Sequence, residues 1–179
     1  MKIINITFLI VLFSPLNGIA QLGYCETPIS VETIVRNGDG ILGETYNKTG
    51  CGLDYVQDSK MITTRYTTDP GTGFPCPLSI SGMPSTYIVE TAYLYWIASY
   101  TLGSGTSPIA NITNPLGATA NYTGALIGED GPKCWTEIGT RGFRADVTAS
   151  VVGNGTYTLN NIVGNTDWEV DGATLIIIY

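Results

Sequence analysis

The feature that most constrains this sequence is a series of short runs of β-branched and aromatic residues, each bounded by Gly, Pro or Asn. The clearest run, Tyr87–Ala98, places Ala92, Leu94 and Trp96 on one face of an extended chain and further apolar residues on the other. No segment repeats apolar residues at helical spacing for more than two turns. This pattern predicts an all-β domain, in which a strand that is apolar on both faces is typically central in its sheet.

The expected architecture is a β-sandwich of two mainly antiparallel sheets, jelly-roll-like, with an immunoglobulin-like sandwich as the alternative. Asp146 and Gly153 bracket one short helical turn, because Asp favours helix starts and Gly favours helix ends. Loops are expected at 36–52, 69–85, 103–108 and 124–132. The other predicted strands are Ile29–Val35, Met61–Thr68, Ile109–Thr113, Ala118–Thr123, Trp135–Ile138, Thr156–Ile162 and Ala173–Tyr179.

The first twenty residues have the form of a cleaved secretory signal. A basic start precedes an apolar stretch, Ile3–Phe13, which is about half of the roughly 20 residues that span a bilayer. Small residues at Gly18 and Ala20 suit a signal peptidase. We therefore expect residues 1–20 to be removed, leaving a secreted, extracellular chain that forms one domain over 21–179 and does not insert into a membrane.

The end of the chain carries a different expectation. The last strand is among the most apolar segments of the chain, and an exposed edge strand of that kind invites aggregation. We therefore expect that the folded unit continues beyond Tyr179, or that this strand is protected by unusual means.

Four cysteines follow the signal, and an even number in an exported chain favours two disulfides. Three pairings are open. The preferred one, Cys25–Cys51 with Cys76–Cys134, closes the shortest loops. A zinc site is disfavoured because no two cysteines have the spacing of a zinc knuckle.

Composition excludes several functional classes. The chain contains no histidine, which removes His-based catalytic triads and every His-containing metal site. Its net charge of −7 opposes binding to nucleic acid, and no basic patch is present. Charged residues make up only 13% of the 179 residues, and no nucleophile motif occurs. The sequence therefore indicates a non-enzymatic chain with no required cofactor.

One acidic triplet remains as a candidate calcium site. Asp167, Glu169 and Asp171 alternate along an extended segment, so their carboxylates would project from one face. Hard cations such as Ca²⁺ prefer clustered oxygen ligands. The alternative reading is a solvated, charged strand that discourages pairing with other chains.

Two tryptophans are candidates for stacking on sugar rings. Trp135 and Trp168 lie in polar surroundings, whereas Trp96 lies in the most apolar segment and is expected in the core. Packing is the simpler role for Trp135 and Trp168 as well.

Four fragments in the second half of the chain, spread over Tyr87–Tyr179, resemble a known module in their order and spacing. It is the secreted β-sandwich module near the N-terminus of Bacteroidetes surface and gliding-motility-associated proteins. The resemblance implies an extracellular structural or adhesive role and carries no catalytic residue. The fragments are Val89–Trp96 (VETAYLYW), Phe143–Thr148 (FRADVT), Gly153–Leu159 (GNGTYTL) and Asp171–Tyr179 (DGATLIIIY).

The sequence thus predicts a structural or adhesive module of a bacterial cell-surface protein, with other surface proteins or extracellular glycans as partners. A calcium-assisted carbohydrate-binding module is the alternative.

Overall fold

The computed structural model describes residues 46–48, 52–63, 71–100, 108–130, 139–163 and 168–179. All described strands lie in one compact unit, Asp54–Tyr179. They are β1 (Tyr55–Met61), β2 (Cys76–Ile80), β3 (Thr91–Tyr100), β4 (Ile109–Thr113), β5 (Thr119–Thr123), β6 (Ala125–Asp130), β7 (Gly139–Asp146), β8 (Gly155–Val163) and β9 (Trp168–Ile178).

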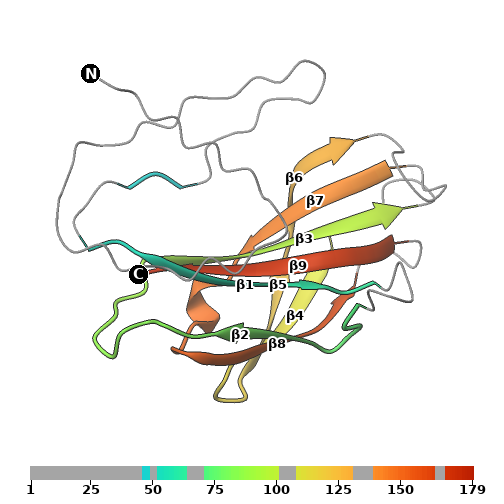
Figure 1. Ribbon diagram of the computed structural model, residues 1–179. Coiled ribbons are helices and arrows are strands. Elements are labelled where there is room, and N and C mark those ends of the chain that lie inside the picture. Colours follow the sequence, from blue (N-terminus) through green and yellow to red (C-terminus); the bar gives the residue numbers. More distant parts are fainter. Residues whose placement is uncertain (1–45, 49–51, 64–70, 101–107, 131–138, 164–167) are drawn as a thin grey trace, which may run out of the picture. The chain divides into compact units, whose positions relative to one another are not determined.

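The strands form two antiparallel sheets that pack face to face, so the predicted β-sandwich is confirmed (Figure 1). The five-stranded sheet has the order β1-β9-β3-β7-β6 and the four-stranded sheet the order β2-β8-β4-β5. Strand partners are nested: β1 pairs with β9, β2 with β8, β3 with β7 and β4 with β5. This nesting is the jelly-roll arrangement, with β6 added at one edge.

The core lies between the two sheets and contains large apolar side chains from both. Alternation along β3 buries Ala92, Leu94 and Trp96, as predicted, whereas Ile97 on the other face is 37% exposed. Trp96 stacks on Phe143 of the neighbouring strand, with ring centroids 5.7 Å apart. The fully buried side chains also include Leu78, Ile112, Tyr157, Leu159, Leu175 and Ile177.

Several element boundaries agree with the sequence. The strand Ile109–Thr113 is confirmed. The strand predicted at 118–123 starts one residue before β5, and the one predicted at 156–162 is one residue shorter than β8 at each end. A 3-10 turn, η1 (Thr148–Ser150), lies inside the predicted helical turn. Asp146 accepts a hydrogen bond from the Thr148 backbone N–H at 3.0 Å.

Other boundaries are corrected. The strand predicted from Tyr87 begins at Thr91, because Tyr87 donates its N–H to Pro84 in a turn. β1 ends at Met61, where a strand was expected to begin. The predicted loops at 69–85 and 124–132 contain β2 and β6. The predicted strands Ile29–Val35 and Trp135–Ile138 lie outside the described residues.

Gly124 explains why the sequence predicted a loop where β6 lies. The chain crosses from β5 in one sheet to β6 in the other through this single residue. A side chain at Gly124 would clash with the Trp96 indole ring. The glycine therefore marks a corner between two strands, not the start of an extended loop.

The last strand is interior, because β9 pairs with β1 on one side and β3 on the other. β9 is therefore not an exposed edge, and the continuation of the folded unit beyond Tyr179 stays a prediction. The two neighbouring strands cover its backbone in the ordinary way. No helix among the described residues is long and apolar enough to cross a membrane.

Candidate functional site

Two polar clusters lie at the end of the five-stranded sheet where β3 ends. Here β3 ends beside the starts of β7 and β9 (Figure 1). Tyr100, the last residue of β3, lies opposite both Gly139 of β7 and Trp168 of β9. We call this the Tyr100 end. Adjacent residues of β3 project to opposite faces of the sheet, so Ser99 belongs to one cluster and Tyr100 to the other.

The first cluster contains two of the three acids predicted to bind calcium. Glu169 lies opposite Ser99, and Asp171 is the extra residue of a β-bulge in β9. The Ser99 hydroxyl donates a hydrogen bond of 2.8 Å to Asp171 Oδ2. The structure therefore brings Glu169 and Asp171 beside one serine, while Asp167 lies outside the described residues.

The backbone of the bulge is also bonded. The Asp171 carbonyl accepts the N–H of Ile62 at 2.9 Å, and the Thr63 hydroxyl donates to the Val170 carbonyl at 2.6 Å. The residues after β1 therefore hold the bulge in place. Among the residues that the structure describes, no group of three or more His, Cys, Asp or Glu side chains could hold a metal ion.

The second cluster joins Tyr100, Glu129 and Arg141. The Tyr100 hydroxyl donates to Glu129 Oε1 at 2.5 Å, and Arg141 Nη2 donates to the same oxygen at 3.2 Å. Arg141 Nε forms an ion pair with Glu129 Oε2 at 3.1 Å. The guanidinium also lies over the Tyr100 ring, 4.5 Å from its centroid, in a cation–π contact.

These contacts fix the charges of the second cluster. The Tyr100 hydrogen bond and then Arg141 lower the pKa of Glu129, because both stabilise its carboxylate. The same hydrogen bond raises the pKa of Tyr100. Glu129 is therefore ionised and Tyr100 neutral over a wide pH range. Because Glu129 already accepts two donors and pairs with Arg141, the cluster suits a structural or recognition role better than proton transfer.

Sequence reasoning missed this cluster. Its three residues lie far apart in the chain, on β3, β6 and β7, and no motif joins them. The one feature that could have predicted the cluster is the pairing of β6 with β7, which places Glu129 directly opposite Arg141. That pairing was invisible while 124–132 was expected to be a loop.

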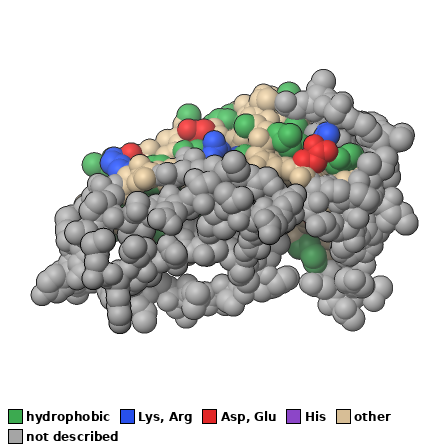
Figure 2. Space-filling view, turned by 90° about the horizontal axis from the view of Figure 1, so that it is seen from above, with side chains coloured by type: hydrophobic (Ala, Val, Ile, Leu, Met, Phe, Trp, Pro, Cys, Tyr) green, Lys and Arg blue, Asp and Glu red, His purple; other side chains and the backbone are tan. Residues whose placement is uncertain are grey.

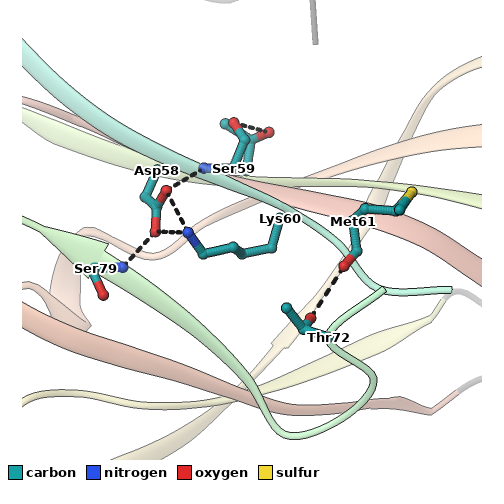
Figure 3. Close-up of polar contacts among 7 residues, drawn as sticks. Asp58, Ser59, Lys60, Met61, Thr72 and Ser79 are labelled. Atoms are coloured by element: carbon teal, nitrogen blue, oxygen red, sulfur yellow. Dashed lines mark hydrogen bonds and ion pairs between the residues drawn. The ribbon is translucent and has the colours of Figure 1, made fainter. Parts of the chain in front are cut away.

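A third polar contact joins the two sheets along the side formed by β1 and β2 (Figure 3). Asp58 and Lys60 pair with the buried residues Leu175 and Ala173, so they lie on the inner face of β1. Asp58 Oδ2 accepts the backbone N–H of Ser79 at 2.7 Å and lies 3.0 Å from Lys60 Nζ. The carboxylate thus connects the edge of one sheet to the edge of the other.

We call the contact between β1 and β2 through Asp58 the seam between the sheets. The chain between β1 and β2 adds further hydrogen bonds beside it. The Thr72 hydroxyl donates to the Met61 carbonyl at 3.1 Å (Figure 3). The Thr72 backbone N–H donates to the same carbonyl at 2.9 Å. The end of edge strand β1 therefore has its backbone bonded by the chain that leads into β2.

Cys76 begins β2 and is fully buried in the core. Burial raises the pKa of its thiol, which favours the protonated form. It is a free cysteine in this structure, and no disulfide is seen among the described residues. Cys25, Cys51 and Cys134 lie outside those residues, so the disulfides remain a prediction.

The candidate sugar-stacking residues are not brought together here. Trp135 lies outside the described residues, and Trp168 is placed only by its backbone, opposite Tyr100. Seen from above the view of Figure 1, acidic and basic side chains lie among hydrophobic ones (Figure 2). No broad patch of a single charge is visible among the described side chains in that view.

Comparison with known proteins adds no relative: no family model, no curated protein and no solved structure matches this chain.

Proposed function

We propose that this chain is a non-enzymatic, extracellular β-sandwich module of a bacterial cell-surface protein, with a structural or adhesive role. Its partners would be other surface proteins or extracellular glycans. The signal-like N-terminus and the resemblance of the second half to Bacteroidetes surface modules support this proposal. Jelly rolls serve many functions, so the fold alone does not decide it.

One observation carries the proposal. The compact unit begins and ends at the same end of the sandwich, where Asp54 and Tyr179 exchange two backbone hydrogen bonds of 2.8 and 2.9 Å. The clusters around Glu169 and Glu129 lie at the Tyr100 end, at the far ends of β9 and β3. The Tyr100 end therefore lies opposite Asp54 and Tyr179 within this unit, and we propose it as the binding end.

The second candidate is a calcium-assisted carbohydrate-binding module. Its support is the placement of Glu169 and Asp171 beside Ser99, next to the start of β9 at Trp168. Calcium would be held by the carboxylates, and Trp168 would stack on a sugar.

Export is tested by expressing residues 1–179 in a bacterium and measuring the intact mass and location of the product. We expect a chain that begins at Gln21, outside the cytoplasm, with the mass decrease of two disulfides. The control variant Ile10→Arg interrupts the apolar stretch and should remain uncleaved inside the cell. An uncleaved wild-type chain in the cytoplasm would contradict the extracellular proposal.

Adhesion is tested with beads that carry the exported chain by its N-terminus, against a glycan array and whole bacterial cells. We expect binding without a calcium requirement, weakened by Glu169→Lys at the Tyr100 end. The matched variant Glu90→Lys makes the same charge change at the opposite end and should bind normally. Calcium-dependent glycan binding lost in Trp168→Ala would favour the second candidate, and polysaccharide cleavage would refute both.

A further inference from the structure

Among the strands that the structure describes, four lie at sheet edges, and three of these carry features that discourage pairing with another chain. β1 has two inward-pointing charges, Asp58 and Lys60, a known protection of edge strands. β2 contains Pro77, which has no N–H, and its Ser79 N–H is bonded to Asp58. β6 carries a β-bulge and two acids at its end.

The fourth edge, β5, has none of these features. Its sequence, Thr119-Ala-Asn-Tyr-Thr123, contains no charge, proline or glycine. It pairs with β4 in unbroken register, and its outward side chains Thr119, Asn121 and Thr123 are exposed. A straight, uncharged edge of this kind is a template for strand addition.

The contacts between β4 and β5 indicate which strand would fit. β4 ends in Ala-Asn-Ile-Thr and β5 in Ala-Asn-Tyr-Thr, so the two strands offer nearly the same pattern. Asn111 Nδ2 donates to Asn121 Oδ1 at 2.6 Å, and the Thr113 and Thr119 hydroxyls lie 2.8 Å apart. A second β5 would therefore present to this edge nearly the groups that β4 already presents to β5.

We propose that the chain self-associates through β5, with two copies related by a two-fold axis that passes beside Asn121. Antiparallel pairing would place Asn121 opposite Asn121 of the second copy and Thr119 opposite Thr123 of the second copy. The interface is self-complementary, as a two-fold contact requires. The four-stranded sheets of the two copies then form one continuous sheet.

The contact is small, because each copy contributes one short strand. It falls at the low end of protein interfaces, so association is reversible and depends on concentration. Tethering of several copies to one surface, as the proposed function implies, would raise their local concentration and strengthen this weak contact. The inference does not depend on the adhesive proposal, since it concerns only the open edge.

Sedimentation velocity of the exported chain over a concentration series tests the proposal. We expect the wild type to shift from monomer towards dimer as concentration rises. Asn121→Lys and Asn121→Asp should each remain monomeric, because like charges meet at the two-fold axis. An equimolar mixture of the two variants should regain the dimer, because the charges are then opposite.

Thr156→Lys is the matched control. It adds the same charge to an exposed position on β8, which is not an edge strand, and should associate like the wild type. Thr123→Lys supplies a second edge variant if the Asn121 variants fail to fold. A wild type that stays monomeric at every concentration would overturn the proposal, as would edge variants that fold and still associate normally.

Discussion

The two sheets of this sandwich differ in their charges: every charged residue of the described strands lies in the five-stranded sheet, and none lies in the four-stranded sheet. The strands of the four-stranded sheet read CPLSI, GTYTLNNIV, IANIT and TANYT. In the five-stranded sheet, charges protect edge β1, form a pair on β6 and β7, and line the bulge of β9. The difference teaches that the two sheets are held by different polar groups: the five-stranded sheet uses charged side chains at an edge, between strands and at a bulge, and the four-stranded sheet uses uncharged ones.

The four-stranded sheet uses amides and hydroxyls in place of charges. Asn160 Nδ2 donates to Asn111 Oδ1 and to Thr113 Oγ1, both at 2.7 Å, and Asn111 donates to Asn121. This Asn/Thr ladder crosses β8, β4 and β5. Such cross-strand pairs stabilise a sheet by a few tenths to about 1 kcal/mol each. They leave the edge of β5 without charge repulsion.

In the core the difference between the sheets should disappear. Leu175 of β9 and Leu159 of β8 are both fully buried, so Leu175→Ala and Leu159→Ala should each cost about 2–5 kcal/mol of unfolding free energy. The control Leu126→Ala, at a side chain that is 53% exposed, should cost far less. Urea unfolding followed by circular dichroism measures all three. A cost near that of the control at either buried leucine would contradict a shared core.

The corner between the sheets gives the next largest effect. In Gly124→Ala the new methyl group meets the Trp96 ring, and such overpacking costs about 1–3 kcal/mol. Gly128→Ala, four residues later on the same segment, places its methyl group where nothing lies within 4 Å. Thermal melts of the two variants should therefore differ clearly. Equal melting temperatures would place Trp96 away from the corner.

The seam between the sheets is tested by Asp58→Ala. The variant leaves the Ser79 N–H and the Lys60 ammonium without their shared partner, which costs about 1–3 kcal/mol. Asp58→Asn keeps an acceptor for Ser79 and should lose less of the unfolding free energy measured in urea. If the two variants are equally unstable, the charge on Asp58 matters more than its bond to β2.

The smallest effect concerns pH at the Tyr100 end. Because the pKa of Glu129 is lower in the folded chain, its contribution to stability is complete above its unfolded pKa. It is lost as pH falls through the folded pKa. Melting temperatures of the wild type and Glu129→Gln should therefore converge in acid. The effect should be small and should weaken with salt, because Glu129 is 42% exposed. A gap that widens in acid would contradict this account.

The strands that the sequence predicts well are those with regular patterns. β4, β5 and β8 alternate without charges, and their boundaries follow from alternation and turns. The sequence did not predict β1, because the charged residues Asp58 and Lys60 occupy its inner face and so interrupt the expected alternation of apolar and polar residues. β2 was missed because it is short and lies among Pro and Gly. In β6, the corner at Gly124 has the same local signal as a turn.

The polar clusters were predictable only in part. Alternation predicted Asp167, Glu169 and Asp171 on one face; in the structure a bulge interrupts the alternation at Asp171, and Glu169 and Asp171 both lie beside Ser99. Tyr100, Glu129 and Arg141 meet only through the order of strands β3, β7 and β6, which local sequence does not encode. The open edge at β5 likewise depends on knowing which strands have a neighbour on each side.

Hydrogen exchange at two protein concentrations, read by mass spectrometry, tests the contrast between the sheets most directly. Peptides covering Tyr55–Met61 and Thr119–Thr123 report the protected edge β1 and the open edge β5. The account predicts that protection of Thr119–Thr123 increases with concentration while protection of Tyr55–Met61 stays constant. Protection that is independent of concentration at both edges, or that increases at β1 alone, would contradict it.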